Sequence, residues 1–243
     1  MDKITILDIL PTCPYPVRAG GSMAIFSMLD KLRHHVNLHV LSIVSEDVMK
    51  NLTDLQELWP DVTFHLYHMK MNKELFIQKS SLRLYSNAIL RSKAISAWII
   101  PFMRYDNKLL NYISNLIDDI NPDIIQTEFY QLQDLVYCLP KSIKKIFIQH
   151  EIHYVVNKMW IESHNLKKDI YAQATYNMLK SQEIASMNAY DAILTLNDAD
   201  KNKLINDGVS SNIFSSPVGV IDAAHRNACT FRGKLVFIGS GGH

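Results

Sequence analysis

The amino-acid sequence predicts an α/β protein built on a doubly wound parallel sheet. Short β-rich runs alternate with longer stretches of helical periodicity along the 243 residues, which is typical of parallel strands joined by crossover helices. Many of the β-rich runs are almost continuously apolar, as strands covered on both faces are. Hydrophobic residues make up 48% of the chain and charged residues 20%, a composition that supports a globular core.

Eight segments are expected to be strands. They lie at residues 3–10, 37–44, 62–69, 123–129, 144–150, 191–196, 212–217 and 234–239. Apolar residues that recur near the 3.6-residue period predict helices between them. These helices are expected at residues 22–35, 109–120, about 159–188, and 198–207.

The chain divides into three parts. Residues 1–216 are expected to form a nearly complete first domain, and residues 217–233, which show little clear periodicity, a linker. Residues 234–243 have the pattern of the first strand of a second domain, followed by a glycine-rich turn that contains Gly239 and Ser240. Because such a strand and turn usually lead into a helix and the rest of a sheet, we expect a truncated second domain.

Composition excludes several classes of protein. The formal net charge of +1 gives no reason to expect nucleic-acid binding, because such domains are usually clearly basic. The three cysteines are widely separated and lack CxxC spacing, which argues against a disulfide framework and favours a reducing cytosol. No signal peptide is visible, and no stretch approaches the roughly 18 apolar residues of a spanning helix. A cytoplasmic protein is therefore expected.

Peripheral contact with a membrane stays open. Residues 73–104 are apolar but carry several lysines and arginines, and a basic amphipathic surface can bind an anionic lipid carrier or membrane face. The alternative, which we favour, is a pair of helices packed on the sheet with solvated basic residues.

A glycine-containing loop follows the first strand. In "PYPVRAGGSMAIF" (14–26), Gly20 and Gly21 precede a helix that Ser22 would cap. Free N–H groups at a helix start attract phosphate, and Arg18 would add a charge-assisted hydrogen bond. The loop matches neither GxGxxG nor a Walker motif, so glycines that serve only the loop's geometry are an equal alternative.

Two further strands end in ionisable residues. "FIQHEIHY" (147–154) runs out into His150 and Glu151, and ligands of open α/β sheets bind beyond the carboxyl ends of strands. Glu128 ends the strand before it, so that Glu128 and Glu151 could face one cleft. A structural histidine and a solvated or helix-capping glutamate are the alternatives. The three-residue spacing of His150 and His153 does not match the HExxH zinc motif.

An acidic pair follows the strand at 191–196. Asp198 and Asp200 form the DxD pattern of many metal-dependent sugar transferases. Here Asn197 can cap a helix whose first turn would hold both acidic residues, as the helix dipole favours. We therefore expect a helix cap and no metal site.

Together these motifs resemble the N-terminal half of a family-4 glycosyltransferase of the GT-B fold, whose two domains are Rossmann-like. The resemblance rests on ordered motifs: Pro16–Ser22, "PDIIQTEF" (122–129), "FIQHEI" (147–152), Glu183 with "YDAILTLNDADKNKL" (190–204), "SPVGVI" (216–221) and "LVFIGSGGH". They span essentially the whole chain. Asn197 stands where the family usually has serine, and Val218-Gly219 where it has Asn-Gly.

The resemblance implies transfer of a sugar from a nucleotide-sugar donor to a saccharide, lipid-linked or small-molecule acceptor. It implies retention of configuration and no metal or other cofactor. Gly20 and Gly21 would face the donor diphosphate with Ser22 and Arg18 as helpers. His150 would lie near the transferred sugar or acceptor, and Glu128 near the acceptor.

Other classes make different predictions. The family holds its donor mainly in the second domain, so this chain alone is expected to be nearly inactive. A non-catalytic module that binds nucleotides or sugar phosphates is the alternative. A Rossmann oxidoreductase is disfavoured, because its fingerprint needs a helix after "GSGG" and an acidic residue about 20 positions later.

Overall fold

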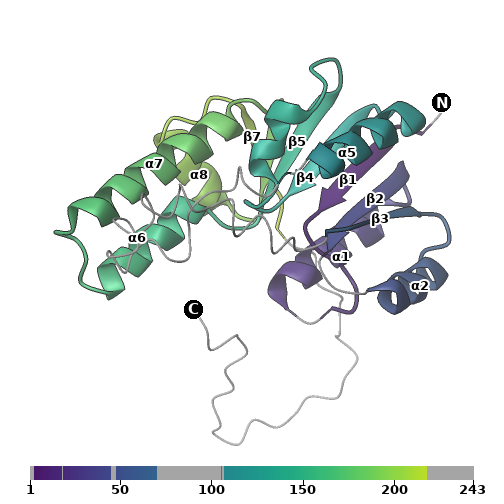
Figure 1. Cartoon of the computed structure of the whole chain (residues 1–243), viewed down its shortest axis with the longest axis horizontal. Coiled ribbons are helices and arrows are strands. Elements are labelled where there is room, and N and C mark those ends of the chain that lie inside the picture. Colours follow the sequence, from purple (N-terminus) through teal and green to yellow (C-terminus); the bar gives the residue numbers. More distant parts are fainter. Residues whose placement is uncertain (1–2, 18, 45–47, 70–104, 106, 218–243) are drawn as a thin grey trace, which may run out of the picture.

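The protein is built on a seven-stranded parallel sheet with helices on both faces (Figure 1). The computed structural model describes residues 3–17, 19–44, 48–69, 105 and 107–217. The strands are β1 (Thr5–Leu10), β2 (Asn37–Val44), β3 (Thr63–His68), β4 (Ile124–Glu128), β5 (Lys144–Gln149), β6 (Ala192–Thr195) and β7 (Asn212–Ser215). The predicted α/β class and parallel sheet are confirmed. The eighth predicted strand, the linker beyond residue 217 and the basic segment 73–104 lie outside the described residues.

The strand order is β3-β2-β1-β4-β5-β6-β7. The chain therefore adds β2 and then β3 on one side of β1, and afterwards β4 to β7 in order on the other side. Between β1 and β4 the crossover connections on their two sides diverge, which opens a crevice at the carboxyl ends of these strands. This edge of the sheet is where a ligand site is expected.

Helices fill the connections. They are α1 (Gly20–Leu32), α2 (Met49–Leu58), α5 (Asn107–Ile120), the 3-10 helix η2 (Gln133–Cys138), α6 (His153–Ser163), α7 (Ile170–Met187) and α8 (Asp198–Asn206). None of the described helices is both long and apolar enough to cross a membrane.

The single helix expected at about 159–188 is wrong, because two helices occupy this region. The chain leaves α6 through Asn165, whose φ of 58° is in the left-handed region and ends a helix. Asp169 then caps α7 by accepting a hydrogen bond from the backbone N–H of Ala172 at 2.8 Å. Figure 1 shows the two helices side by side, extending beyond the sheet.

Alternate residues of β1 face two different hydrophobic cores. Leu7 and Ile9 pack with α5 on one face of the sheet, whereas Ile6 and Leu10 pack with α1 and Trp59 on the other. Because side chains alternate along a strand, Asp8 points to the same face as Ile6 and Leu10. An ionisable residue is unusual at such a central, buried position of a sheet.

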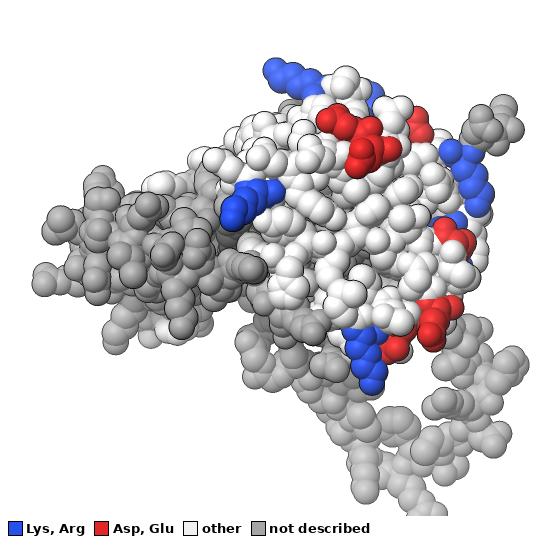
Figure 2. Space-filling view, turned by 45° about the vertical axis from the view of Figure 1, so that its right-hand side comes forward, with Lys and Arg blue, Asp and Glu red and all other residues white. Residues whose placement is uncertain are grey.

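Charged side chains are dispersed on one face of the described chain. On the face shown in Figure 2, acidic and basic side chains are interspersed, and the described part of that face carries no continuous basic patch.

Candidate functional site

Glu128 and His150 form a buried pair at the carboxyl edge of the sheet. Glu128 ends β4, and His150 directly follows β5, the neighbouring parallel strand. The Oε2 atom of Glu128 lies 2.6 Å from Nε2 of His150, and their side chains are 0% and 6% exposed. The burial of Glu128 excludes the alternative that this carboxyl group is simply solvated.

Asp8 adds a second buried carboxyl group to this pair. Asp8 is opposite Gln126 in the pairing of β1 with β4, and the alternation of side chains puts Glu128 on the same face. Gln126 Nε2 donates a hydrogen bond to Glu128 Oε1 at 3.3 Å. Both oxygens of Asp8 are buried without a well-aligned hydrogen-bond partner among the described residues. Two carboxyl groups in one desolvated place cannot both ionise readily, so the cluster retains a proton.

Burial shifts the pKa of each of the three groups in the direction that favours its neutral form. Burial raises the pKa of Glu128 to about 8. Burial, and then the nearby Glu128 charge, raise the pKa of Asp8 well above its usual range. Burial lowers the pKa of His150 to about 4, although the charge of Glu151 acts in the opposite direction. Both directions favour an uncharged pair, in which a protonated Glu128 donates to Nε2 of a neutral imidazole.

This proton position leaves Nδ1 of His150 as the N–H of the ring, because the partner of one ring nitrogen fixes the tautomer. Among the described residues no hydrogen bond is made by Nδ1. In this tautomer Nδ1–H is a hydrogen-bond donor.

Phe129 connects this pair to the start of α1. Its ring stacks on the His150 imidazole, with centroids 3.9 Å apart and planes within 2° of parallel. Its φ of 65° is rare for a bulky residue, and such backbone strain clusters at functional sites. A Cβ atom at Gly21 would lie 3.1 Å from Cζ of Phe129. Gly21, Phe129 and His150 therefore lie in one row.

The start of α1 differs from the expectation in one respect. Ala19, in an extended conformation, is the N-cap residue, so the expected cap at Ser22 is wrong. Ser22 is in the first turn, where its hydroxyl accepts from the backbone N–H of Ala19 at 3.0 Å and donates to its carbonyl at 2.9 Å. The first N–H groups of the helix, at Gly20 and Gly21, have no partner within the helix. Arg18 lies outside the described residues.

The other expected acidic residues are in different surroundings. Glu151 is exposed, whereas Glu128 is fully buried. Asn197 caps α8 by accepting from the backbone N–H of Asp200 at 2.8 Å, which confirms the predicted helix cap. Asp198 accepts a hydrogen bond from Ser215 on β7. Gly239 and Ser240 lie outside the described residues.

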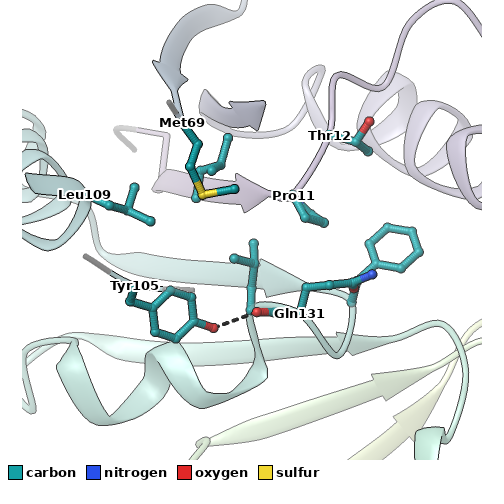
Figure 3. A pocket seen from close by; sticks show the side chains of 9 residues that line it. Pro11, Thr12, Met69, Tyr105, Leu109 and Gln131 are labelled. Atoms are coloured by element: carbon teal, nitrogen blue, oxygen red, sulfur yellow. Dashed lines mark hydrogen bonds between the residues drawn. The ribbon is translucent and has the colours of Figure 1, made fainter. Parts of the chain in front are cut away.

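A cavity of about 310 Å³ lies between the carboxyl ends of the strands and the start of α5 (Figure 3). Its described lining residues are Pro11, Thr12, Ile43, Met69, Tyr105, Leu109, Phe129, Gln131 and Leu132. Apart from Tyr105 and Leu109, which belong to α5 and the chain before it, they lie at or after the ends of β1, β2, β3 and β4, so the cavity is at the crevice that the strand order predicts. Phe129 belongs both to the wall of this cavity and to the row with His150.

Sequence reasoning missed Asp8 and Phe129. Asp8 is a single acidic residue in the otherwise apolar run "ITILDIL", and an unpaired charge in a predicted central strand signals a functional or paired group. Phe129 directly follows Glu128, but nothing in the sequence indicates its left-handed backbone.

Comparisons with known proteins identify the fold. No family model matches the sequence, and no curated protein matches it significantly. A UDP-glucosyltransferase from Polygonum tinctorium capable of glucosylating indoxyl aligns over 96% of this chain with a TM-score of 0.55 and 7% identity. Sucrose-phosphate synthase from Thermosynechococcus elongatus aligns over 90% with a TM-score of 0.54 and 11% identity. An Arabidopsis thaliana protein solved with UDP-L-rhamnose aligns over 95% with a TM-score of 0.50 and 13% identity.

The chain spans about half the length of these solved structures, 56%, 49% and 56% respectively. At such low identity the likeness shows the fold alone. The described chain has the Rossmann-like fold of one half of a GT-B glycosyltransferase.

Proposed function

We propose that this chain is the acceptor-side half of a glycosyltransferase that moves a sugar from a nucleotide-sugar donor to an acceptor. One observation carries the proposal: Phe129 stacks on the ring of the buried Glu128–His150 pair, faces Gly21 at the start of α1 and lines a cavity at the switch point of the sheet. The half-GT-B fold supports it, as do the ordered sequence motifs that resemble family-4 glycosyltransferases. Retention of configuration and independence of metal belong to the same proposal.

His150 is the proposed substrate-contacting residue. Its neutral ring presents Nδ1–H as a hydrogen-bond donor to an oxygen of the transferred sugar or the acceptor. Glu128 acts through His150, since the proton that it donates to Nε2 fixes this tautomer. Stacking on Phe129 holds the plane of the ring.

The start of α1 is proposed to face the donor diphosphate. Glycosyl transfer develops negative charge on the leaving phosphate, and preorganised N–H groups stabilise such charge without reorganisation. Gly20 and Gly21 would supply these N–H groups at the positive end of the helix dipole. Arg18 is proposed to assist, and Gly239 and Ser240 to belong to the opposing donor-side loop.

The test is transfer by the natural gene product that contains this chain. UDP- and GDP-sugars would be offered, and release of the nucleoside diphosphate measured. We expect His150→Ala to lower turnover at least about 100-fold, as loss of a positioned proton-transfer or hydrogen-bonding histidine typically does. His35→Ala is the matched control, because His35 is exposed in the turn after α1.

Two outcomes would contradict the proposal. Donor binding without any nucleotide release would favour the non-catalytic binding module. A His150→Ala variant with a lower melting temperature and unchanged turnover per folded molecule would make His150 a structural residue.

A further inference from the structure

A second cavity lies within the hairpin that α6 and α7 form. It has a volume of about 180 Å³, and its described lining residues are Lys158, Ile161, Glu162, Lys167, Gln173 and Tyr176. It shares none of them with the cavity beside Phe129. In Figure 1 the hairpin extends beyond the sheet, with the turn that joins its two helices at the far end. This cavity is therefore separate from the proposed transfer site.

The polar side chains of this wall are available to an anion. Among the described residues, Lys158 makes no ion pair, and the Gln173 amide and the Tyr176 hydroxyl make no hydrogen bond. Lys167 Nζ lies 3.5 Å from Glu162 Oε1, and both side chains are exposed. Such a loose surface pair contributes little stability, so Lys167 can turn to another anion. Together the wall offers ammonium, amide and hydroxyl donors, which suit the oxygens of a phosphate group.

Two apolar side chains follow the cavity wall along the chain and are exposed to water. Ile170 and Tyr171 begin α7 shortly after Lys167 and Lys168, and they are 81% and 55% exposed. Lysines next to an aliphatic side chain and an aromatic ring with a polar tip are typical of segments at a membrane–water boundary. A free phosphate ester in the cavity would leave both apolar side chains in water.

We propose that the α6–α7 hairpin is a docking site for a membrane surface that contains anionic phospholipids. The cavity receives a lipid phosphate, and Ile170 and Tyr171 enter the headgroup region. Over residues 158–171 three lysines outnumber the carboxylates Glu162 and Asp169, and Asp169 is already used as the cap of α7. Because lysines near an anionic leaflet are attracted to its negative surface potential, charge complementarity supports this occupant. The inference does not depend on the proposed sugar transfer.

Sedimentation with vesicles tests the inference on the natural gene product that contains this chain. Vesicles of phosphatidylcholine alone would be compared with vesicles of an equimolar mixture of phosphatidylcholine and phosphatidylglycerol. We expect binding to the mixed vesicles to be at least about tenfold stronger and to weaken in high salt, because salt screens the lysines.

A soluble phosphate ester distinguishes a lipid from a free ligand of the same chemistry. Glycerol 1-phosphate would be titrated with the same protein. We expect it to bind at least about tenfold more weakly than the mixed vesicles, since it gains nothing from Ile170 and Tyr171.

Exposed side chains provide variants that should fold. The double variant Lys158→Gln/Lys167→Gln removes both ammonium groups of the cavity, and we expect it to weaken binding to the mixed vesicles at least about tenfold. Ile170→Ser should weaken this binding about fivefold to tenfold, because less apolar surface leaves water. Lys141→Gln and Ile4→Ser are the matched controls, since both residues are exposed and precede strands of the sheet. Each control should stay within about twofold of the wild type.

Three results would overturn the inference: no preference for the mixed vesicles, wild-type binding by either the double lysine variant or Ile170→Ser, or equally tight binding of glycerol 1-phosphate. The second result would place membrane contact elsewhere on the protein, and the third would make the cavity a site for a soluble phosphate ester. The outcome is separable from that of the proposed function, because vesicle binding needs no sugar donor. Vesicle binding without nucleotide release would leave the docking site intact and refute the transferase.

Discussion

Two buried glutamates, Glu183 on α7 and Glu128 at the end of β4, are held in different ways. Glu183 is 6% exposed and accepts hydrogen bonds from the backbone N–H groups of His153 and Tyr154 at 2.9 and 2.8 Å. A third, from Gln149 Nε2, is 3.3 Å long. Among the described residues Glu128 is bonded by side chains, the His150 ring and the Gln126 amide, and it has the Asp8 carboxyl as a neighbour.

The difference separates a structural carboxyl group from a functional one. Glu183 satisfies N–H groups at the start of α6 that no carbonyl of the helix can reach, so its loss leaves buried donors unpaired. The partners of Glu128 are side chains, a titratable imidazole and an amide, and not backbone N–H groups of a helix. Its loss would change where a proton is held more than it would change the fold.

The largest expected effect is on stability at Glu183. Glu183→Gln keeps one acceptor oxygen and turns an amide N–H₂ toward a backbone donor. We expect the free energy of unfolding to fall by about 2–4 kcal/mol, because a buried donor is left unsatisfied. Denaturant unfolding measures this, with the exposed Glu57→Gln as control. A loss below about 0.5 kcal/mol would show that Glu183 does not hold α6.

Substitution of Glu128 is expected to lower turnover more than stability. Glu128→Leu removes the group that fixes the His150 tautomer, and turnover of the natural gene product should fall about 100-fold. Glu128→Gln should recover most of it, since an amide N–H can also donate to Nε2. Stability should hardly change in Glu128→Gln, which keeps polar partners for His150 and Gln126. Glu128→Leu leaves the buried Gln126 amide unpaired and should lower the free energy of unfolding by about 1–3 kcal/mol, so turnover is compared per folded molecule. Equal loss in both variants would indicate an ionised Glu128 instead.

The raised pKa of Glu128 also predicts a pH dependence of stability. The folded chain keeps this proton up to pH about 8, whereas the usual glutamate pKa is 4.5, so stability falls as pH rises between these values. His150 acts in the opposite direction: its pKa is lowered from 6.5 to about 4, so its contribution is lost as pH falls through that range.

Melting curves of Glu128→Gln test this window. Between pH 6.5 and 8 the wild-type melting temperature should fall by several degrees relative to the variant, since about 1 kcal/mol corresponds to about 2–4 °C at this chain length. Glu183 titrates in both proteins and cancels in the difference. Parallel curves would mean that Glu128 is ionised in the folded chain.

The smallest expected effect is at the start of α1. A Cβ at Gly21 meets the Phe129 ring at 3.1 Å, whereas a Cβ at Gly20 meets nothing within 4 Å. Gly21→Ala should displace the ring and its stacked imidazole, lowering turnover about threefold to tenfold. Gly20→Ala should leave turnover unchanged. If both alanines are equally tolerated, the contact of Gly21 with Phe129 does not position His150.

The sequence predicts the sheet and the strand ends because both follow from local pattern. Apolar runs identify β1, β4 and β5, and parallel strands bring their carboxyl ends to one edge. The strand pattern alone therefore places Glu128 and His150 at the same edge. The sequence also identifies Asn197 as a helix cap, since capping depends on residues only three apart.

What the sequence does not predict depends on contacts distant in the chain. Asp8 becomes part of the site only through pairing of β1 with β4. The expected cap at Ser22 is wrong because the backbone turns into the helix three residues earlier, at Ala19. The break between α6 and α7 depends on the left-handed conformation of Asn165, which periodicity does not reveal.

At position 129, thermal stability and activity favour different residues. A left-handed backbone at a bulky residue costs on the order of 1–3 kcal/mol, and a glycine would relieve that strain. The same glycine would remove the aromatic face beneath the imidazole and part of the cavity wall. A screen for thermal tolerance and a screen for catalysis would therefore select different residues at this position.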